Sequence, residues 1–182
     1  MNVTPTEQNI YVLDATAFIG FNFPILMEPK VFPNATFFTT SSVASELKDF
    51  RSKMNLRSMK ESGLLQFNTP NPEILHEITK KIKMIDPQST LSDVDKDILT
   101  LALQLKGILI TNDFAVQNIA YFLKIPIKSI NGKKITNFRK WQLKCRSCGK
   151  NLEIYFQTCP HCGGQLKRRQ ISFIKEEPEE GE

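Results

Sequence analysis

Apolar and polar positions follow two rhythms along the first 130 residues of the chain. Short runs rich in apolar and β-branched residues, typical of strands, lie at 10–13, 35–40, 64–67, 108–111 and 125–130. Amphipathic stretches, which we predict as helices, alternate with them at 16–19, 43–50 with a further stretch at 52–62, 72–85, 93–106 and 112–124. This alternation indicates an α/β domain in which a parallel sheet is flanked by helices.

Capping signals place the ends of several helices. Pro72 stands in the first turn of one helix, and Ser92 precedes another that we expect Gly107 to end. Ser41 or Ser42 is expected to cap the segment 43–50, which we predict to run on toward the further stretch at 52–62.

Acidic residues stand where such a sheet binds ligands. Asp14 directly follows the strand 10–13, and Asp113 follows the strand 108–111. Glu46 and Asp95 lie near the starts of helices, which face the same carboxyl edge of the sheet. Carboxylates that converge repel one another, so we expect Mg²⁺ or Mn²⁺ among them. The pattern is typical of metal-assisted phosphodiester hydrolysis.

Each of the four acids has a structural alternative. Asp14 and Asp113 could cap the helices that follow them. Asp95 forms an S-x-x-D capping box with Ser92, and Glu46 could lie on a solvated helix face. From spacing alone the metal centre is therefore a hypothesis.

All four cysteines of the chain fall in two C-x-x-C pairs. Cys145 and Cys148 form the first pair, Cys159 and Cys162 the second, and a glycine follows each pair. Four thiolates at this spacing are typical of a closed, structural zinc site. The alternatives are two disulfides, which a cytosolic chain disfavours, and a redox C-x-x-C, which two matched pairs disfavour. We expect one structural Zn²⁺ in a zinc ribbon, with His161 on its surface.

The ribbon lies in a basic part of the chain. Residues 1–132 carry equal numbers of basic and acidic residues, whereas residues 133–170 carry ten Lys and Arg against Glu153 alone. Such a block beside a neutral body favours a polyanion partner, with nucleic acid first, over a merely solvated basic surface. The last twelve residues are acidic, with five Glu against Lys175.

The chain is expected to divide at the points where its composition changes. We predict a nuclease-like domain at 1–130, a connector at 131–143, the zinc ribbon at 144–170 and a disordered acidic tail at 171–182. No run approaches the length of a membrane span, and the first residues lack the pattern of a signal peptide. We therefore expect a cytoplasmic protein that makes no contact with membranes.

Four segments resemble, in order, the acidic motifs of PIN-domain ribonucleases: VLDATAFI, VASEL, LSDVDKDILTLA and ILITNDFAVQNIA. The wording TNDFAVQNIA, followed by SINGKKITNFRKWQLKC and a C-x-x-C ribbon, is similar to one branch, the Nin-one-binding (Nob) endonucleases in their archaeal form. The resemblance covers roughly residues 9–167. It implies a PIN-like parallel sheet flanked by helices, plus a small C-terminal zinc ribbon.

The resemblance also implies roles for individual residues. Asp14, Glu46, Asp95 and Asp113 would be the catalytic acids and would hold one or two Mg²⁺ or Mn²⁺. Thr16 and Thr111 match hydroxyl positions that support the acids, and Asn112 stands where many relatives have another acid, which weakens a second metal site. Basic residues would grip RNA phosphates: Arg139, Lys140, Lys144, Arg146, Lys150, Lys167, Arg168 and Arg169. Trp141, Tyr155 and Phe156 could stack bases, although burial in the ribbon is favoured for the last two.

The function that the resemblance implies is cleavage of precursor small-subunit (16S) rRNA at its mature 3′ end during ribosome biogenesis. The partners would be this precursor rRNA, the pre-ribosomal particle and ribosome-assembly proteins. Two alternatives stay open. One is a non-catalytic RNA-binding assembly factor, and the other is a toxin-like PIN ribonuclease that acts on other RNAs.

Overall fold

A parallel five-stranded sheet forms the centre of the computed structural model, which describes residues 9–20, 28, 30–130 and 134–175. The strand order is β3-β2-β1-β4-β5, and every neighbouring pair runs parallel. The strands are β1 Asn9–Leu13, β2 Ala35–Thr39, β3 Leu65–Phe67, β4 Ile108–Ile110 and β5 Ile127–Lys128. Strand β1 lies in the middle and ends at Asp14, so this carboxylate stands at the centre of the carboxyl edge.

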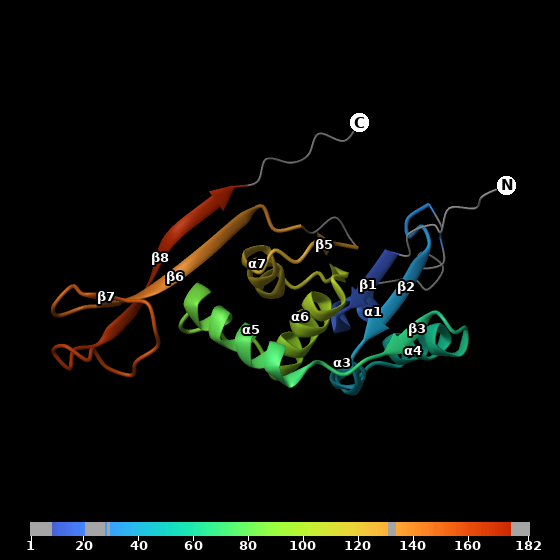
Figure 1. The fold of residues 1–182 in the computed structure, drawn as a ribbon, viewed down its shortest axis with the longest axis horizontal. Helices are drawn as coiled ribbons and strands as arrows, with labels where there is room; N and C mark the ends of the chain where they lie inside the picture. The colour runs from blue at the N-terminus through green and yellow to red at the C-terminus, as the bar shows by residue number, and fades with distance from the viewer. Residues whose placement is uncertain (1–8, 21–27, 29, 131–133, 176–182) are drawn as a thin grey trace.

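Helices flank this sheet, which confirms the predicted α/β class (Figure 1). Helix α6 contacts β1 and β4, helix α7 contacts β5, and α1 packs with α3 and α4. The described helices are α1 Ala15–Gly20, α3 Ser41–Glu46, α4 Phe50–Glu61, α5 Pro72–Ile85, α6 Asp93–Leu105 and α7 Phe114–Phe122. None of the helices in the described ranges is long and apolar enough to cross a bilayer.

The structure corrects three details of the predicted helices. The helix predicted at 43–50 ends at Glu46, because Leu47 turns extended and buries its side chain. Asp49 then caps α4, the further stretch predicted at 52–62, through the Ser52 N–H. Thr40 caps α3, in place of the serines that follow it. Helix α6 ends at Leu105, and its C-cap is Lys106 in the left-handed conformation. Gly107, which was expected to end this helix, comes one residue later.

The C-terminal part is a second, antiparallel sheet in the order β7-β6-β8. Its strands are β6 Asn137–Cys145, β7 Asn151–Leu152 and β8 Leu166–Lys175. Strands β6 and β8 pair from Cys145 with Leu166 to Asn137 with Lys175. This pairing differs from the expected connector at 131–143 and the expected disordered tail from 171, because residues 137–143 and 171–175 complete each other's strand hydrogen bonds. The remainder of that tail, 176–182, lies outside the described residues.

The long hairpin of β6 and β8 lies against α5 and α7 (Figure 1). Asn118 of α7 bonds the backbone of Arg139 twice, donating to its carbonyl at 2.9 Å and accepting from its N–H at 2.7 Å. Tyr121 stacks on Phe138, with ring centroids 3.8 Å apart. Arg168 of β8 pairs with Asp86, just after α5, at 2.5 Å. The ribbon is therefore docked on the nuclease-like body through directed contacts.

Candidate active site and metal centres

Asp14 closes β1 at the carboxyl edge of the sheet and is only 4% exposed. Its Oδ1 accepts a hydrogen bond from the Ala15 N–H at 2.6 Å. Its Oδ2 accepts from the hydroxyls of Thr16 at 2.9 Å and Thr111 at 2.7 Å. Burial raises the pKa of Asp14, and these three hydrogen bonds oppose the rise because each favours the ionised carboxylate.

The two threonine hydroxyls are held in turn by the backbone. Thr16 Oγ1 accepts from the Asn112 N–H at 2.9 Å, and Thr111 Oγ1 accepts from the Asp113 N–H at 3.0 Å. Each hydroxyl has one proton, and the geometry directs both protons to Oδ2 of Asp14. These hydrogen bonds favour the ionised form of Asp14, and Oδ1, which accepts only from the Ala15 N–H among the described residues, retains a lone pair that a cation could use.

Asp95 and Glu46 extend the negative charge around Asp14. The half-buried Asp95 completes the predicted capping box, in which its Oδ2 accepts from the Ser92 N–H at 2.8 Å. Partial burial raises the pKa of Glu46, the charges of Asp95 and Asp14 raise it further, and Lys48 lowers it. The charge of Asp95 also raises the pKa of Asp14. Three of the four predicted acids thus share one electrostatic field.

The side chains of Asp113 and Asn112 are engaged by other groups. Asp113 caps α7, where its Oδ1 accepts from the Ala115 N–H at 2.6 Å and the Val116 N–H at 3.3 Å. The amide oxygen of Asn112 is bonded by Ser129 Oγ at 3.1 Å and by the Ile130 N–H at 3.2 Å. Both residues therefore support Asp14 through their backbone N–H groups, which hold the two threonines.

The sequence analysis did not predict the supporting roles of three residues, Ser42, Asp97 and Gln117. Ser42 of α3 donates to the Asp97 carboxylate of α6 at 2.8 Å, and so joins the helix of Glu46 to the helix of Asp95. Gln117 is fully buried and donates to the Thr111 carbonyl at 2.9 Å, while its Oε1 accepts from the Ile135 N–H at 2.7 Å. For Gln117, the only signal in the sequence was a polar residue on an apolar helix face, and this does not reveal its partner.

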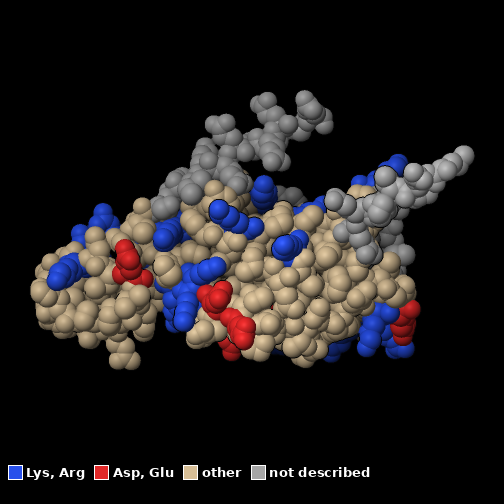
Figure 2. Space-filling model, viewed as in Figure 1, with Lys and Arg blue, Asp and Glu red and all other residues tan. Residues whose placement is uncertain are grey.

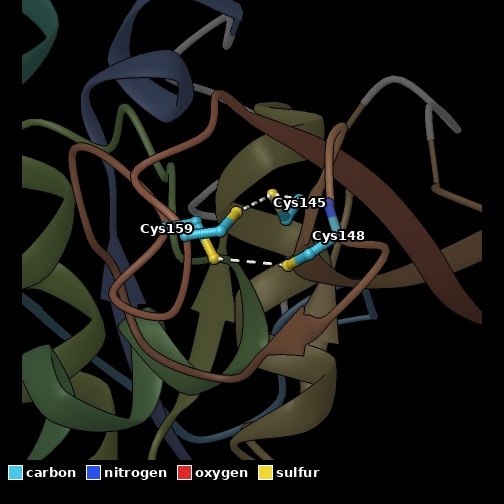
Figure 3. Close-up of side chains that lie close together, drawn as sticks. Cys145, Cys148 and Cys159 are labelled. Atoms are coloured by element: carbon cyan, nitrogen blue, oxygen red, sulfur yellow. Dashed lines mark hydrogen bonds between the residues drawn. The ribbon is translucent and has the colours of Figure 1, made fainter.

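The four cysteine sulfurs lie within 4.8 Å of one another. Cys145 and Cys162 are 3.5 Å apart at sulfur, and Cys148 and Cys159 are 3.7 Å apart. Figure 3 shows the side chains of Cys145, Cys148 and Cys159 turned toward a common centre. All four thiols are free, so the alternative of two disulfides does not describe this arrangement.

The cysteine cluster fits a tetrahedral zinc ion. Sulfur atoms about 2.3 Å from zinc at tetrahedral angles stand about 3.8 Å from one another, close to the two observed separations. Gly149 and Gly163 take φ of 74° and 70° directly after the second cysteine of each pair, which lets each turn fold back. The Cys148 N–H points to the sulfur of Cys145 and contributes most to lowering the pKa of that thiol to about 6.

Among the described residues, no other set of three or more potential ligands is as compact as the cysteines. The acids around Asp14 therefore do not form a closed cage. Mg²⁺ does not require one, because it is commonly held by one or two carboxylates and completes its shell with water and phosphate oxygens. The donor chemistry of Asp14, Asp95 and Glu46 fits such an ion.

Basic side chains cover much of the ribbon. On the face drawn in Figure 2, Lys and Arg extend from the hairpin at the left to the middle of the molecule. Lys144 of β6 stands directly opposite Lys167 of β8, and like charges opposite each other weaken a strand pair. Most predicted phosphate-binding residues are exposed, and two are half-buried, namely Lys140 and Lys144.

The structure revises the expectations for three aromatic or basic residues. The expected burial of Tyr155 in the ribbon was wrong, because the residue is 48% exposed. The Lys83 Nζ of α5 lies 5.5 Å from the centroid of its ring. Phe156 is half-buried. Arg168 is engaged by Asp86 and lies over the Trp141 ring, 3.9 Å from its centroid, so it holds the ribbon to the body.

Residues 11–105, more than half of the chain, match the family described as "PIN domain of ribonuclease". The chain is 32% identical over 163 residues to Ribonuclease VapC1 of Thermoplasma acidophilum, covering 87% of this chain and 77% of that protein. It is 30% identical over 165 residues to Endoribonuclease Nob1 of Methanothermobacter thermautotrophicus, covering 87% of this chain and 92% of that protein.

The fold has a counterpart among solved structures. A domain of a functionally unknown protein from Methanocaldococcus jannaschii matches with a TM-score of 0.50 and 20% identity, over 67% of this chain and 91% of that chain. The family match contains Asp14, Glu46 and Asp95, and it confirms the resemblance drawn from the acidic motifs. The chain therefore belongs to the PIN-domain family of ribonucleases, as an endoribonuclease similar over most of its length to archaeal Nob1 proteins.

Proposed function

We propose that the chain cleaves precursor small-subunit (16S) rRNA at its mature 3′ end during ribosome biogenesis. Its partners are then this precursor rRNA, the pre-ribosomal particle and ribosome-assembly proteins, and its place is the cytoplasm. The proposal rests on the similarity to several Nob1 endoribonucleases, on the basic ribbon and on the acidic centre.

One observation carries the catalytic part of the proposal. Asp14 is buried at the carboxyl edge of the sheet, yet two threonine hydroxyls and a backbone N–H hold it as a carboxylate. Asp95 and Glu46 add negative charge to the same place. A fold that concentrates charge in this way at a cost in stability gains from a divalent cation.

The acids Asp14, Glu46 and Asp95 would hold one or two Mg²⁺ or Mn²⁺, with Asp113 beside them. A bound ion supplies a Lewis acid for the scissile phosphate and lowers the pKa of water. Thr16 and Thr111 orient the Asp14 carboxylate and leave Oδ1 for the cation. Ser42 and Asp97 hold the helices of Glu46 and Asp95 together.

The ribbon would supply the affinity for RNA. With one structural zinc ion on Cys145, Cys148, Cys159 and Cys162, strands β6 and β8 carry Lys140, Lys144, Lys167 and Arg169 on one face of their sheet and Arg139 on the other. Seven residues would contact phosphates directly: Arg139, Lys140, Lys144, Arg146, Lys150, Lys167 and Arg169. Arg168 instead secures the ribbon through Asp86.

The test is a cleavage assay on an RNA oligonucleotide that spans the mature 3′ end of 16S rRNA. Asp14→Asn removes the central charge and nearly preserves its shape, so we expect binding without cleavage. Asp93→Asn is the matched control, since Asp93 is an exposed acid on the helix of Asp95 and pairs only with Lys96 among the described residues. Mn²⁺, Mg²⁺ and a chelator are compared for each protein.

A single cut at the junction that needs the ion and Asp14, but not Asp93, supports the proposal. Equal cleavage by Asp14→Asn and wild type overturns the assignment of the site. Tight binding with no cut under any condition identifies an RNA-binding assembly factor. Equally rapid cleavage of unrelated RNAs identifies a toxin-like ribonuclease.

A further inference from the structure

A cavity of about 530 Å³ opens where the ribbon meets the nuclease body. Its walls come from the loop after α5, the first turns of α7, the segment that leads into β6, and both strands of the hairpin. Its size lies within the range of about 300–1,000 Å³ that is usual for ligand pockets. Neither domain alone would form it.

Aromatic and cationic side chains line this cavity together. Phe114 projects from the start of α7 and is 52% exposed, although it is the residue after Asp113. Arg139 of β6 also lines the cavity; its backbone is fixed by Asn118 and the residue is exposed. In the part of the chain that the structure describes, no ion pair involves the Arg139 guanidinium.

The back of the cavity is rigid and electrically balanced. Trp141 is held by the Arg168 guanidinium, 3.9 Å from its ring centroid. Arg168 is fixed in turn by Asp86, whose carboxylate is buried at the end of α5. Asp86 is thereby neutralised, which leaves the Arg139 guanidinium to give the cavity a positive character.

We propose that this cavity binds one nucleotide of single-stranded RNA, with the base against Phe114 and the phosphate at Arg139. The proposal rests on the proposed ribonuclease function and adds a specificity site to it. An exposed ring beside a fixed cation suits a nucleotide, because base faces stack on aromatic rings and phosphates pair with Arg. Since Phe114 follows Asp113 directly, the bound nucleotide would belong to the same RNA strand that enters the acidic centre.

Trp141 makes the cavity observable, because it is the one tryptophan in the chain. The experiment uses the full chain carrying Asp14→Asn, so that RNA binds without being cut. A short single-stranded RNA is titrated while Trp141 emission and the anisotropy of labelled RNA are both recorded. We expect the Trp141 signal to change with the same midpoint as the anisotropy. A duplex of the same sequence should leave Trp141 unchanged, because its bases stay stacked.

Two variants in the Asp14→Asn chain complete the test. Phe114→Ala should weaken single-stranded RNA binding by about 5- to 150-fold, the range expected for one lost base stack. Phe50→Ala is the matched control, since Phe50 is 81% exposed at the start of α4 and does not line the cavity. It should bind as the parent does.

The outcomes separate this proposal from the proposed function. RNA binding that leaves Trp141 unchanged, or an affinity of Phe114→Ala equal to that of Phe50→Ala, overturns the nucleotide site even if wild type cuts RNA. The absence of any RNA binding overturns it as well. A Trp141 response that Phe114→Ala weakens, in a protein whose wild type never cleaves, upholds the nucleotide site and overturns the nuclease assignment.

Discussion

Replacing Thr111 with Val tests whether the threonine hydroxyls hold Asp14 as a charge. The two side chains have similar shapes, but Val lacks the hydroxyl that donates to Asp14 Oδ2 at 2.7 Å. A hydrogen bond to a charged group contributes about 1.5–3 kcal/mol to stability. The Asp113 N–H also loses its acceptor, which costs about 1–3 kcal/mol more. We expect a loss of about 2.5–6 kcal/mol in the free energy of unfolding while Asp14 is ionised.

The loss of free energy that comes from the missing hydrogen bond to Asp14 depends on pH, because Asp14 titrates. Burial already raises the pKa of Asp14 in the folded state, and removing the hydroxyl raises it further. As the pH falls through the folded pKa of each protein, Asp14 becomes neutral in both. The part of the Thr111→Val destabilisation that comes from the Asp14 charge is therefore present above the folded pKa of the variant, and it is lost as the pH falls through the folded pKa of wild type.

The measurement is urea unfolding across this pH range, with zinc present and no other divalent ion. Thr100→Val is the control, since Thr100 is equally buried but donates to a neutral acceptor, the Lys96 carbonyl, at 2.7 Å. Its destabilisation should be about 1 kcal/mol and independent of pH. Thr111→Ser keeps the hydroxyl and should follow the pH dependence of wild type. A pH-independent loss for Thr111→Val would show that Thr111 serves packing and not the charge of Asp14.

Two further predictions concern the ions. Glu46→Gln should raise stability at neutral pH without Mg²⁺ or Mn²⁺, by less than about 1 kcal/mol because Glu46 is exposed. The sign follows from the raised pKa of Glu46, which makes folding less favourable once this carboxylate ionises, and the gain should vanish below about pH 4. Stabilisation by added Mn²⁺, read by thermal unfolding, should be smaller than in wild type, and an unchanged Mn²⁺ effect would remove Glu46 from the site. Removing zinc with a chelator, or replacing Cys159 by Ser, should disorder the ribbon and weaken RNA binding while the parallel sheet stays folded. Amide exchange measured by NMR distinguishes the two parts, and full protection of β7 without zinc would contradict a structural role for the metal.

The sequence predicted the sheet well because its signals are local. The strand β1 is a continuous apolar run that ends on a charge, and α5 and α6 carry their own caps, Asn71 and Ser92. Where tertiary contacts decide, the sequence misled. The helix predicted at 43–50 ends at Glu46 because the Leu47 side chain enters the core, and no local pattern encodes that choice.

The candidate site divides in the same way. The position of Asp14 at a strand end is a local feature, and the zinc ligands follow from their spacing. The partner of Thr111 is 97 residues away, and the partner of Ser42 is 55 residues away. Hydrogen bonds over such separations depend on the finished topology, so the sequence could suggest the acids but not what holds them.

Contacts made by α7 link the acidic centre to the basic hairpin of β6 and β8. Gln117 binds the Thr111 carbonyl on one side and the backbone at Ile135 on the other, so the segment entering β6 is tied to the strand end beside Asp14. One residue further along α7, Asn118 fixes the backbone of Arg139. A single helix thus positions both the acidic centre and the first part of the basic hairpin. Under the proposed function, RNA held by the hairpin would be presented to Asp14 in a fixed register only while these contacts persist. Catalytic precision in this protein should therefore depend on α7 as much as on the acids themselves.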